Sequence, residues 1–135
     1  MVSMNVRNMT QPNPLDTVNN LTAAINRGDL DAALTLYEPD AVLVAQPGQI
    51  ARGRAAIRAA LAGFVSLKPT LRGQAQQIVE AGDIVLYCSR WTLIGSSPDG
   101  KKVEMGGFSS DVLRRQTDGK WLIAIDNPWG TSIVG

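Results

Sequence analysis

The hydrophobic pattern of the chain changes its period at Pro69, and this change constrains the fold more than any other feature. Before Pro69, apolar residues recur at helical spacing, which predicts three helices and one short strand, at 14–28, 29–38, 53–65 and 41–47. After it come strand-like runs separated by the turn-forming sequences AGD, SSPDG and TDG, at 70–82, 84–95, 101–116 and 120–127. Helices followed by a meander of strands predict an α+β fold, with three N-terminal helices on an antiparallel sheet.

The limits of the first two helices are marked by capping residues. Asn13 and Pro14 suit the start of the first helix, and Gly28 suits its end. Asp29 can cap the second helix at once, and its apolar stripe reaches Tyr37 just before Pro39. We therefore expect Tyr37 on the apolar face of the second helix, close to the core.

The run from Ile84 to Ile94 is apolar on both of its alternating sets of residues. A sheet strand with one solvated face should alternate between apolar and polar residues. The helices can cover only one face, so the pattern predicts a homodimer packed through the outer face of the sheet.

Length and composition indicate one globular domain. The chain has 135 residues with 44% hydrophobic residues, enough for a core over residues 14–135, while residues 1–13 predict a flexible tail. The net charge of +1 argues against nucleic-acid binding. No apolar run reaches the roughly 18–20 residues that cross a bilayer, and the N-terminus lacks a signal-peptide core. We expect a cytoplasmic protein without membrane association.

The chain contains no histidine, which excludes histidine-based triads and histidine zinc sites. Its one cysteine, Cys88, lies within an apolar run and is interpreted as a buried hydrophobic residue. The carboxylates do not form a metal-ligand set, and no cofactor motif is present, so we expect neither a metal nor a cofactor. Acid–base chemistry would fall to Asp, Glu, Tyr, Lys or Cys.

Three segments together resemble a known superfamily: AAINRGDLDAALTLYEPDAVLV, GRAAIRAAL and PDGKKVEMGGFSSDVLRRQTDGKWLIAIDNPWG. They are similar to the nuclear transport factor two-like superfamily, in particular its ketosteroid-isomerase-like and polyketide-cyclase-like branch. The resemblance covers about residues 15–130. It implies a curved sheet wrapped around the helices into a cone, an apolar pocket inside, and a dimer through the outer sheet face.

The catalytic residues of a ketosteroid isomerase are only partly matched. That enzyme uses an aspartate base, and a tyrosine with a protonated aspartic acid as its oxyanion hole. The resemblance places Ala45 at the base and Leu21 at the tyrosine, and matches only Asp111 to the second carboxyl. The sequence therefore argues against steroid isomerisation by that mechanism.

Limonene-epoxide hydrolases of the same fold use two aspartates bridged by an arginine, with further residues that hold water. The resemblance places Arg90 at the arginine and Asp126 at one aspartate, but Thr92 at the other. Leu43 and Ala45 fall at the water-holding positions. Half of the constellation is present, which argues against epoxide hydrolysis.

The candidate catalytic residues are therefore Asp126, Arg90 and Asp111. We expect Arg90 and Asp126 to form an ion pair in the interior, which is either structural or part of an acid–base site. Asp111 points either into the pocket, where burial would raise its pKa, or toward the outer face. The predicted pocket residues are Tyr37, Leu43, Ala45, Ile57, Trp91, Thr92, Phe108 and Trp129.

Two functions remain open at this point. One is a cofactor-independent isomerase, cyclase or hydratase that acts on a small lipophilic or aromatic metabolite through carboxylates. The other is a non-catalytic domain that binds a lipophilic ligand or serves as a dimeric accessory subunit.

Overall fold

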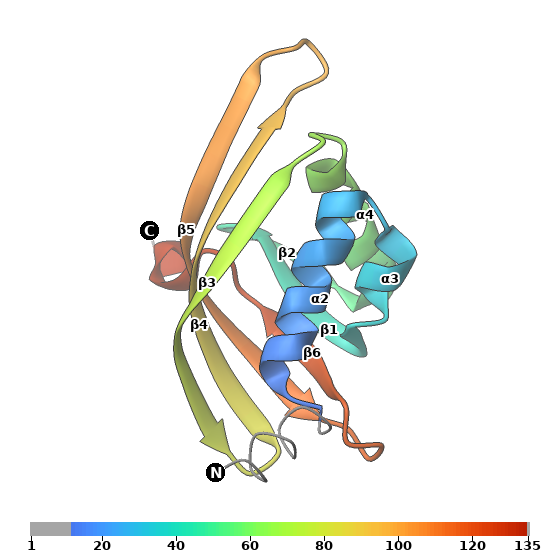
Figure 1. Ribbon diagram of the computed structural model, residues 1–135, viewed down its shortest axis with the longest axis vertical. Coiled ribbons are helices and arrows are strands. Elements are labelled where there is room, and N and C mark those ends of the chain that lie inside the picture. The colour runs from blue at the N-terminus through green and yellow to red at the C-terminus, as the bar shows by residue number, and fades with distance from the viewer. Residues whose placement is uncertain (1–11, 135) are drawn as a thin grey trace, which may run out of the picture.

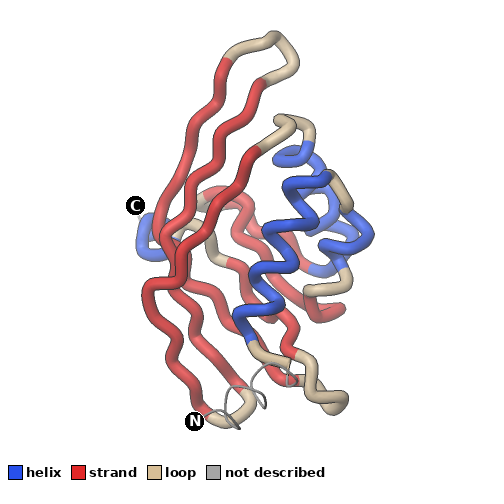
Figure 2. The backbone as a smooth tube through the Cα atoms, viewed as in Figure 1, coloured by secondary structure: helices blue, strands red, loops and turns tan. Residues whose placement is uncertain are grey.

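The computed structural model describes residues 12–134, so nearly all of the predicted flexible tail, residues 1–13, lies outside the described residues. In this part of the chain six strands form one curved sheet, and the α-helices lie on its concave side (Figures 1 and 2). The helices are α2 (Pro14–Arg27), α3 (Leu30–Leu34), α4 (Gly53–Val65) and the 3-10 helix η1 (Gly130–Val134). The strands are β1 (Tyr37–Gln46), β2 (Gln49–Arg52), β3 (Thr70–Ala81), β4 (Ile84–Ser96), β5 (Lys102–Arg115) and β6 (Trp121–Asp126).

The predicted α+β architecture, with helices α2, α3 and α4 inside a curved sheet, is confirmed. The sheet is mixed and not purely antiparallel as predicted, because β1 pairs with β6 in parallel. The strand order is β2-β1-β6-β5-β4-β3, so the last strand of the chain lies between the first and the fifth. Within residues 12–134 a membrane-crossing helix is absent, and the longest helix, α2, has 14 residues.

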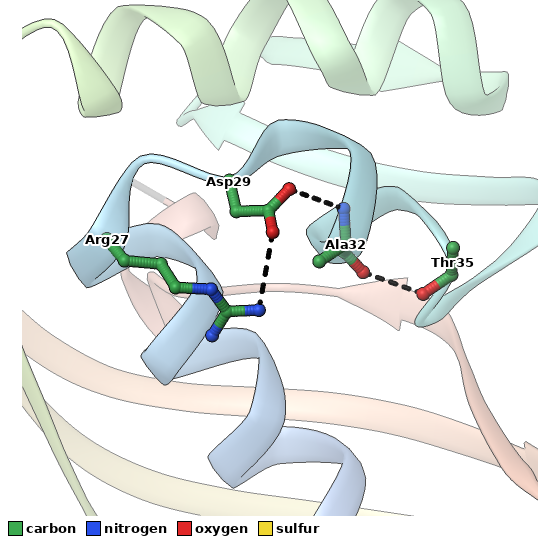
Figure 3. Close-up of polar contacts among 4 residues, drawn as sticks. All are labelled: Arg27, Asp29, Ala32 and Thr35. Carbon is green, nitrogen blue, oxygen red and sulfur yellow. Dashed lines mark hydrogen bonds and ion pairs between the residues drawn. The ribbon is translucent and has the colours of Figure 1, made fainter.

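Capping residues mark the start of α2 and the junction between α2 and α3, as the sequence predicts. The side chain of Asn13 accepts a hydrogen bond from the backbone of Asp16, and Gly28 ends α2 with a left-handed φ of 75°. The carboxylate of Asp29 then accepts the Ala32 N–H at 3.0 Å and pairs with Arg27 at 3.5 Å (Figure 3). These local contacts allow two helices to join through a single short turn.

The predicted placement of Tyr37 on the second helix is wrong. Helix α3 ends at Leu34, and Tyr37 begins β1, where it lies opposite Ile123 of β6. The residue before Pro39 is restricted to extended conformations, and the Ile123 N–H donates to the Leu36 carbonyl at 2.9 Å. Strand pairing therefore outweighs the helical spacing of the apolar residues.

The segment after Pro47 forms the second strand of a hairpin. Gly48 has a φ of 83°, which suits the tight turn, and β2 pairs with β1 in antiparallel orientation.

The core lies between the helices and the concave sheet face. Helices α2 and α4 contribute buried residues at the predicted helical spacing, α3 contributes Ala33, and the central strands contribute their inward-facing residues. The largest fully buried side chains are Tyr37, Leu43, Ile57, Val85 and Leu113.

Strand β4 alternates strictly between its two faces. Residues 85, 87, 89, 91 and 93 are buried on the concave side, whereas residues 84, 86, 90, 92 and 94 are exposed on the convex side. The exposed set is still largely apolar: Leu86 is 40% and Ile94 is 49% exposed. We call Val79, Ile84, Leu86, Ile94, Phe108 and Ile125 the outer apolar face.

Gly95 and Gly73 provide a matched test of strand packing. A Cβ atom at Gly95 would lie 2.6 Å from the Leu67 carbonyl oxygen, whereas one at Gly73 would meet nothing within 4 Å. We expect Gly95→Ala to lower the free energy of unfolding by about 1–3 kcal/mol through overpacking. Gly73→Ala should leave it unchanged or raise it by about 0.5–1 kcal/mol. Urea denaturation of both variants measures the difference, and equal stabilities would contradict this interpretation.

Candidate active site

A cavity of about 120 Å³ lies between the helices and the concave face of the sheet. Most of its wall is apolar, and the polar groups gather on the strands. The wall comprises Val18, Leu21, Thr22, Ile25, Leu43, Leu61, Phe64, Leu71, Arg72, Gly73, Tyr87, Ser89, Trp91, Leu93, Ser109, Asp111, Asp126 and Pro128.

Two carboxyl groups, of Asp111 and Asp126, face each other in this wall. Asp126 is the last residue of β6, and Asp111 lies on the neighbouring strand β5. Asp111 is on the inward-facing set of β5, with only 9% of its surface exposed. The charge of Asp126 acts on Asp111, so ionisation of both carboxyl groups at once is disfavoured.

Each carboxyl group also has a hydrogen-bond donor. The hydroxyl of Tyr37 donates to Oδ2 of Asp126 at 2.5 Å, and the backbone N–H of Asn127 donates to Oδ1 of Asp111 at 2.7 Å. These contacts hold both groups in the cavity wall.

The surroundings change the acidity of all three side chains. Burial raises the pKa of Asp111 well above its ordinary value, and the Asp126 charge raises it further. Burial also raises the pKa of Asp126, but the hydrogen bond from Tyr37 opposes this rise. The pKa of Tyr37 is raised by burial and then by Asp126, which keeps its phenol protonated as a donor.

The polar network continues across the sheet through two buried serines. The hydroxyls of Ser89 and Ser109 lie 2.5 Å apart, and Ser109 acts on Asp111 by opposing the rise of its pKa. The network therefore follows the strand order, from Tyr37 on β1 through Asp126 and Asp111 to Ser89 on β4.

Two tryptophans fix the segment after Asp126. The indole N–H of Trp91 donates to the Pro128 carbonyl at 2.6 Å, and that of Trp129 donates to the Val44 carbonyl at 3.0 Å. The two rings pack edge to face with their centroids 5.5 Å apart. This packing holds Asn127, the donor to Asp111, against the end of the cavity.

The structure brings together part of the predicted site. Asp126, Asp111, Leu43 and Trp91 line the cavity. Of the two orientations that the sequence allowed for Asp111, the structure has the inward one. Tyr37 reaches the site through its hydroxyl, which donates to Asp126.

The predicted Arg90–Asp126 ion pair is wrong. Arg90 alternates with Trp91 on β4 and therefore points to the convex face, where its guanidinium lies 6.0 Å from the centre of the Phe108 ring. Phe108 is 63% exposed on that face, and Thr92 is exposed there as well. Arg90, Thr92 and Phe108 are thus separated from the cavity by the sheet itself.

Three other predicted pocket residues lie near the cavity without lining it. Ile57 is fully buried in the core, because α4 packs its apolar stripe onto the sheet. Ala45 is partly buried on β1, beyond Leu43. Trp129 packs behind Trp91.

Ser89, Ser109 and Gly73 line the cavity, although the sequence did not predict them as pocket residues. A signal for Ser89 and Ser109 was present, because they alternate in phase with Trp91 and Asp111 on their strands. Gly73 has no local signal, since its place in the wall depends on the pairing of β3 with β4.

Comparisons with known proteins agree with this architecture. The sequence profile of the SnoaL-like domain family matches residues 18–123. The chain belongs to this family. None of the curated proteins compared with this SnoaL-like domain matches it significantly.

Solved structures share the fold of this SnoaL-like domain. A nuclear transport factor 2-like superfamily protein from Salmonella enterica has a TM-score of 0.76 at 19% identity, over 96% of this chain and 93% of that one. A ketosteroid isomerase-like protein from Erwinia carotovora has 0.71 at 20%, over 82% and 88%. A candidate dehydratase of the NTF2-like family from Streptomyces avermitilis has 0.70 at 17%, over 82% and 89%. Likeness at these identities establishes the fold alone.

The raised pKa of Asp111 predicts a pH-dependent stability. Between its ordinary value of 3.8 and its raised pKa, the folded SnoaL-like domain binds more protons than the unfolded chain. The stabilisation from this carboxyl is therefore complete below about pH 3.8 and is lost as the pH rises through the raised pKa. Asp111→Asn removes this titration and can still accept the Asn127 N–H.

We expect the stability difference, wild type minus Asp111→Asn, to decrease steadily as the pH rises from about 3 to about 8. Urea denaturation at a series of pH values measures it. Ser110→Ala is the control, because this neighbouring residue faces outward and carries no ionising group. A pH-independent difference for Asp111→Asn would contradict the raised pKa.

Proposed function

We propose that this domain binds a small, mostly apolar metabolite in the cavity and catalyses proton transfer on it, as an isomerase, cyclase or hydratase. The observation that carries the proposal is the pair of carboxyl groups, Asp111 and Asp126, which line the same mostly apolar cavity and whose charges act on each other. Carboxyl groups in such surroundings are typical of acid–base sites.

The surroundings assign different roles to the two carboxyl groups. Asp126 ionises first, because Tyr37 donates a hydrogen bond to its carboxylate. Asp111 retains its proton, because burial and the Asp126 charge both disfavour its ionisation. Asp126 is then the general base and Asp111 the general acid.

A ligand with a carbonyl group would react in a balanced sequence. Asp126 takes a proton from the carbon beside the carbonyl, while Asp111 donates a proton to the carbonyl oxygen, and an enol forms. In a dehydration, the reverse of a hydratase reaction, Asp126 takes a proton from the neighbouring carbon while Asp111 protonates the hydroxyl group, which leaves as water, and a carbon–carbon double bond forms. Both reactions transfer only protons to and from the two carboxyls, so the proposed chemistry needs no cofactor.

The cavity volume indicates the size of the ligand. An apolar cavity of about 150 Å³ holds one benzene molecule. The 120 Å³ cavity therefore accommodates about one ring, and a larger ligand would extend beyond the enclosed space. This size favours a small cyclic or branched metabolite over a whole steroid.

Hydrogen–deuterium exchange tests the proposal without a known substrate. Cyclohexanone in D₂O exchanges the protons beside its carbonyl when a base removes them, and proton NMR follows this loss. We expect the wild type to accelerate the exchange. Asp126→Asn should abolish the acceleration, and Asp111→Asn should reduce it by about 10²–10⁴-fold, the usual effect of a catalytic acid or base.

Glu38→Gln is the control, since the Glu38 carboxylate pairs with Arg114 and does not line the cavity. If Asp126→Asn exchanged cyclohexanone as fast as the wild type, the acid–base proposal would be wrong.

A non-catalytic ligand-binding domain is the second candidate. Leu21 and Leu43, which line the cavity, occupy positions where the resemblance to isomerases and epoxide hydrolases expects polar groups. Ligand-induced NMR shifts in the cavity without any exchange would favour this function.

We also propose that a second copy of the chain covers the outer apolar face, and that the domain works in the cytoplasm, which stays a prediction. The support for self-association is the exposure of Val79, Ile84, Leu86, Ile94, Phe108 and Ile125 on one face. Apolar contacts of this kind are typical of stable homodimers.

Light scattering coupled to gel filtration tests this association. We expect the wild type to have twice the mass of one chain and Leu86→Asp to be monomeric, because a buried charge disfavours the interface. Leu15→Asp on α2 is the matched control and should stay dimeric, since Leu15 is exposed on the helical side. A monomeric wild type would refute self-association.

A further inference from the structure

We propose that the cavity opens to solvent between α2 and the edge strand β3, and that the missing side chain of Gly73 sets the width of this opening. The opening would then determine which ligands reach Asp111 and Asp126. This inference rests on the proposed function, because an opening matters only if the cavity takes up a ligand.

Solvent exposure locates the opening. Among the residues that line the cavity, only Arg72 and Gly73 are exposed, and of these Gly73 belongs to the concave set, since Arg72 lies opposite Thr92 of the convex face. Both lie on β3, which pairs with β4 on one side and is the last strand of the sheet on the other. The cavity therefore reaches the surface at this edge, where α2 runs beside β3 (Figure 1).

Two hydrogen bonds between Asn26 and Leu71 hold α2 against β3 at one end of this opening. The amide of Asn26 on α2 donates to the Leu71 carbonyl at 2.9 Å, and its oxygen accepts the Leu71 N–H at 2.6 Å. Because β3 is the last strand of the sheet, these two bonds satisfy the backbone N–H and C=O of Leu71 that a further strand would otherwise pair with. Thr22 and Val18 lie about one and two helical turns before Asn26 on the same helix. Both line the cavity together with Gly73.

Gly73 faces the cavity and is not required by the backbone. It lies opposite Trp91, and Leu71 lies opposite Leu93, and both of these β4 residues line the cavity. A Cβ atom at Gly73 would meet nothing within 4 Å, and its φ lies outside the left-handed region. Any residue could therefore occupy position 73, but its side chain would project into the opening.

The absence of a side chain at this point matters most for larger ligands. The enclosed cavity holds about one ring, so a ligand with two rings must extend through the opening. A side chain at position 73 would narrow this route without touching the carboxyl groups.

Two ketones of different size test this selection. Cyclohexanone has one ring and 2-decalone has two, and the NMR signal of the Trp91 indole N–H reports binding. We expect Gly73→Val to weaken the binding of 2-decalone at least tenfold and that of cyclohexanone by less than about threefold, the difference being steric. Gln74→Val is the matched control, because residue 74 lies opposite Arg90 on the convex face. Equal binding of 2-decalone by Gly73→Val and the wild type would overturn the inference.

A tethered probe tests the geometry without relying on ligand affinity. Gly73→Cys, in a Cys88→Ala background, is treated with benzyl methanethiosulfonate, whose benzyl sulfur forms a disulfide with the thiol and releases methanesulfinate. We expect the benzyl group to enter the cavity and shift the signals of Leu21, Leu93 and the Trp91 indole. The same label on Gln74→Cys should leave these signals in place.

The two proposals can fail separately. If the label on Gly73→Cys leaves the cavity signals unmoved, position 73 does not face the opening and this inference is wrong, even if exchange depends on Asp126. If the label fills the cavity but Asp126→Asn still exchanges cyclohexanone normally, the opening stands and the acid–base function fails.

Discussion

Parallel pairing between β1 and β6 places the last strand of the chain in the middle of the sheet, between β1 and β5. This pairing sets Leu43 beside Asp126 and brings the Tyr37 hydroxyl to the Asp126 carboxylate. On the other side of β6, β5 supplies Asp111. The carboxyl pair, its phenol donor and the cavity around them therefore all depend on one contact between strands that are far apart in the sequence.

A pair of carboxyl groups in an apolar cavity is an unfavourable feature for folding alone. Burial disfavours their ionisation, and an apolar pair of similar size would often be neutral or stabilising. The structure limits the cost with donors from Tyr37 and Asn127, and every buried side-chain polar atom in residues 12–134 has a hydrogen-bond partner. A cavity wall that keeps a costly but fully bonded pair of acids is better explained by chemistry than by stability.

The sheet separates two surfaces of different composition. Its concave face carries the network from Tyr37 to Ser89, whereas its convex face carries exposed apolar residues around Arg90 and Phe108. Alternation along β4 decides which residue belongs to which face. A substitution on the convex face should therefore change self-association before it changes the cavity, and the reverse should hold for Gly73.

Local signals in the sequence determined the helices, their caps at Asn13 and Asp29, and the change to strands after Pro69, because these depend on neighbouring residues. The resemblance identified both site aspartates but paired Asp126 with Arg90, although strict alternation with Trp91 excludes that residue from the cavity. The true partner of Asp126 is Tyr37, which is 89 positions away in the sequence. Only the tertiary structure decided this contact, because hydrogen bonding between distant strands, and not local propensity, ended α3 early and drew Tyr37 into β1.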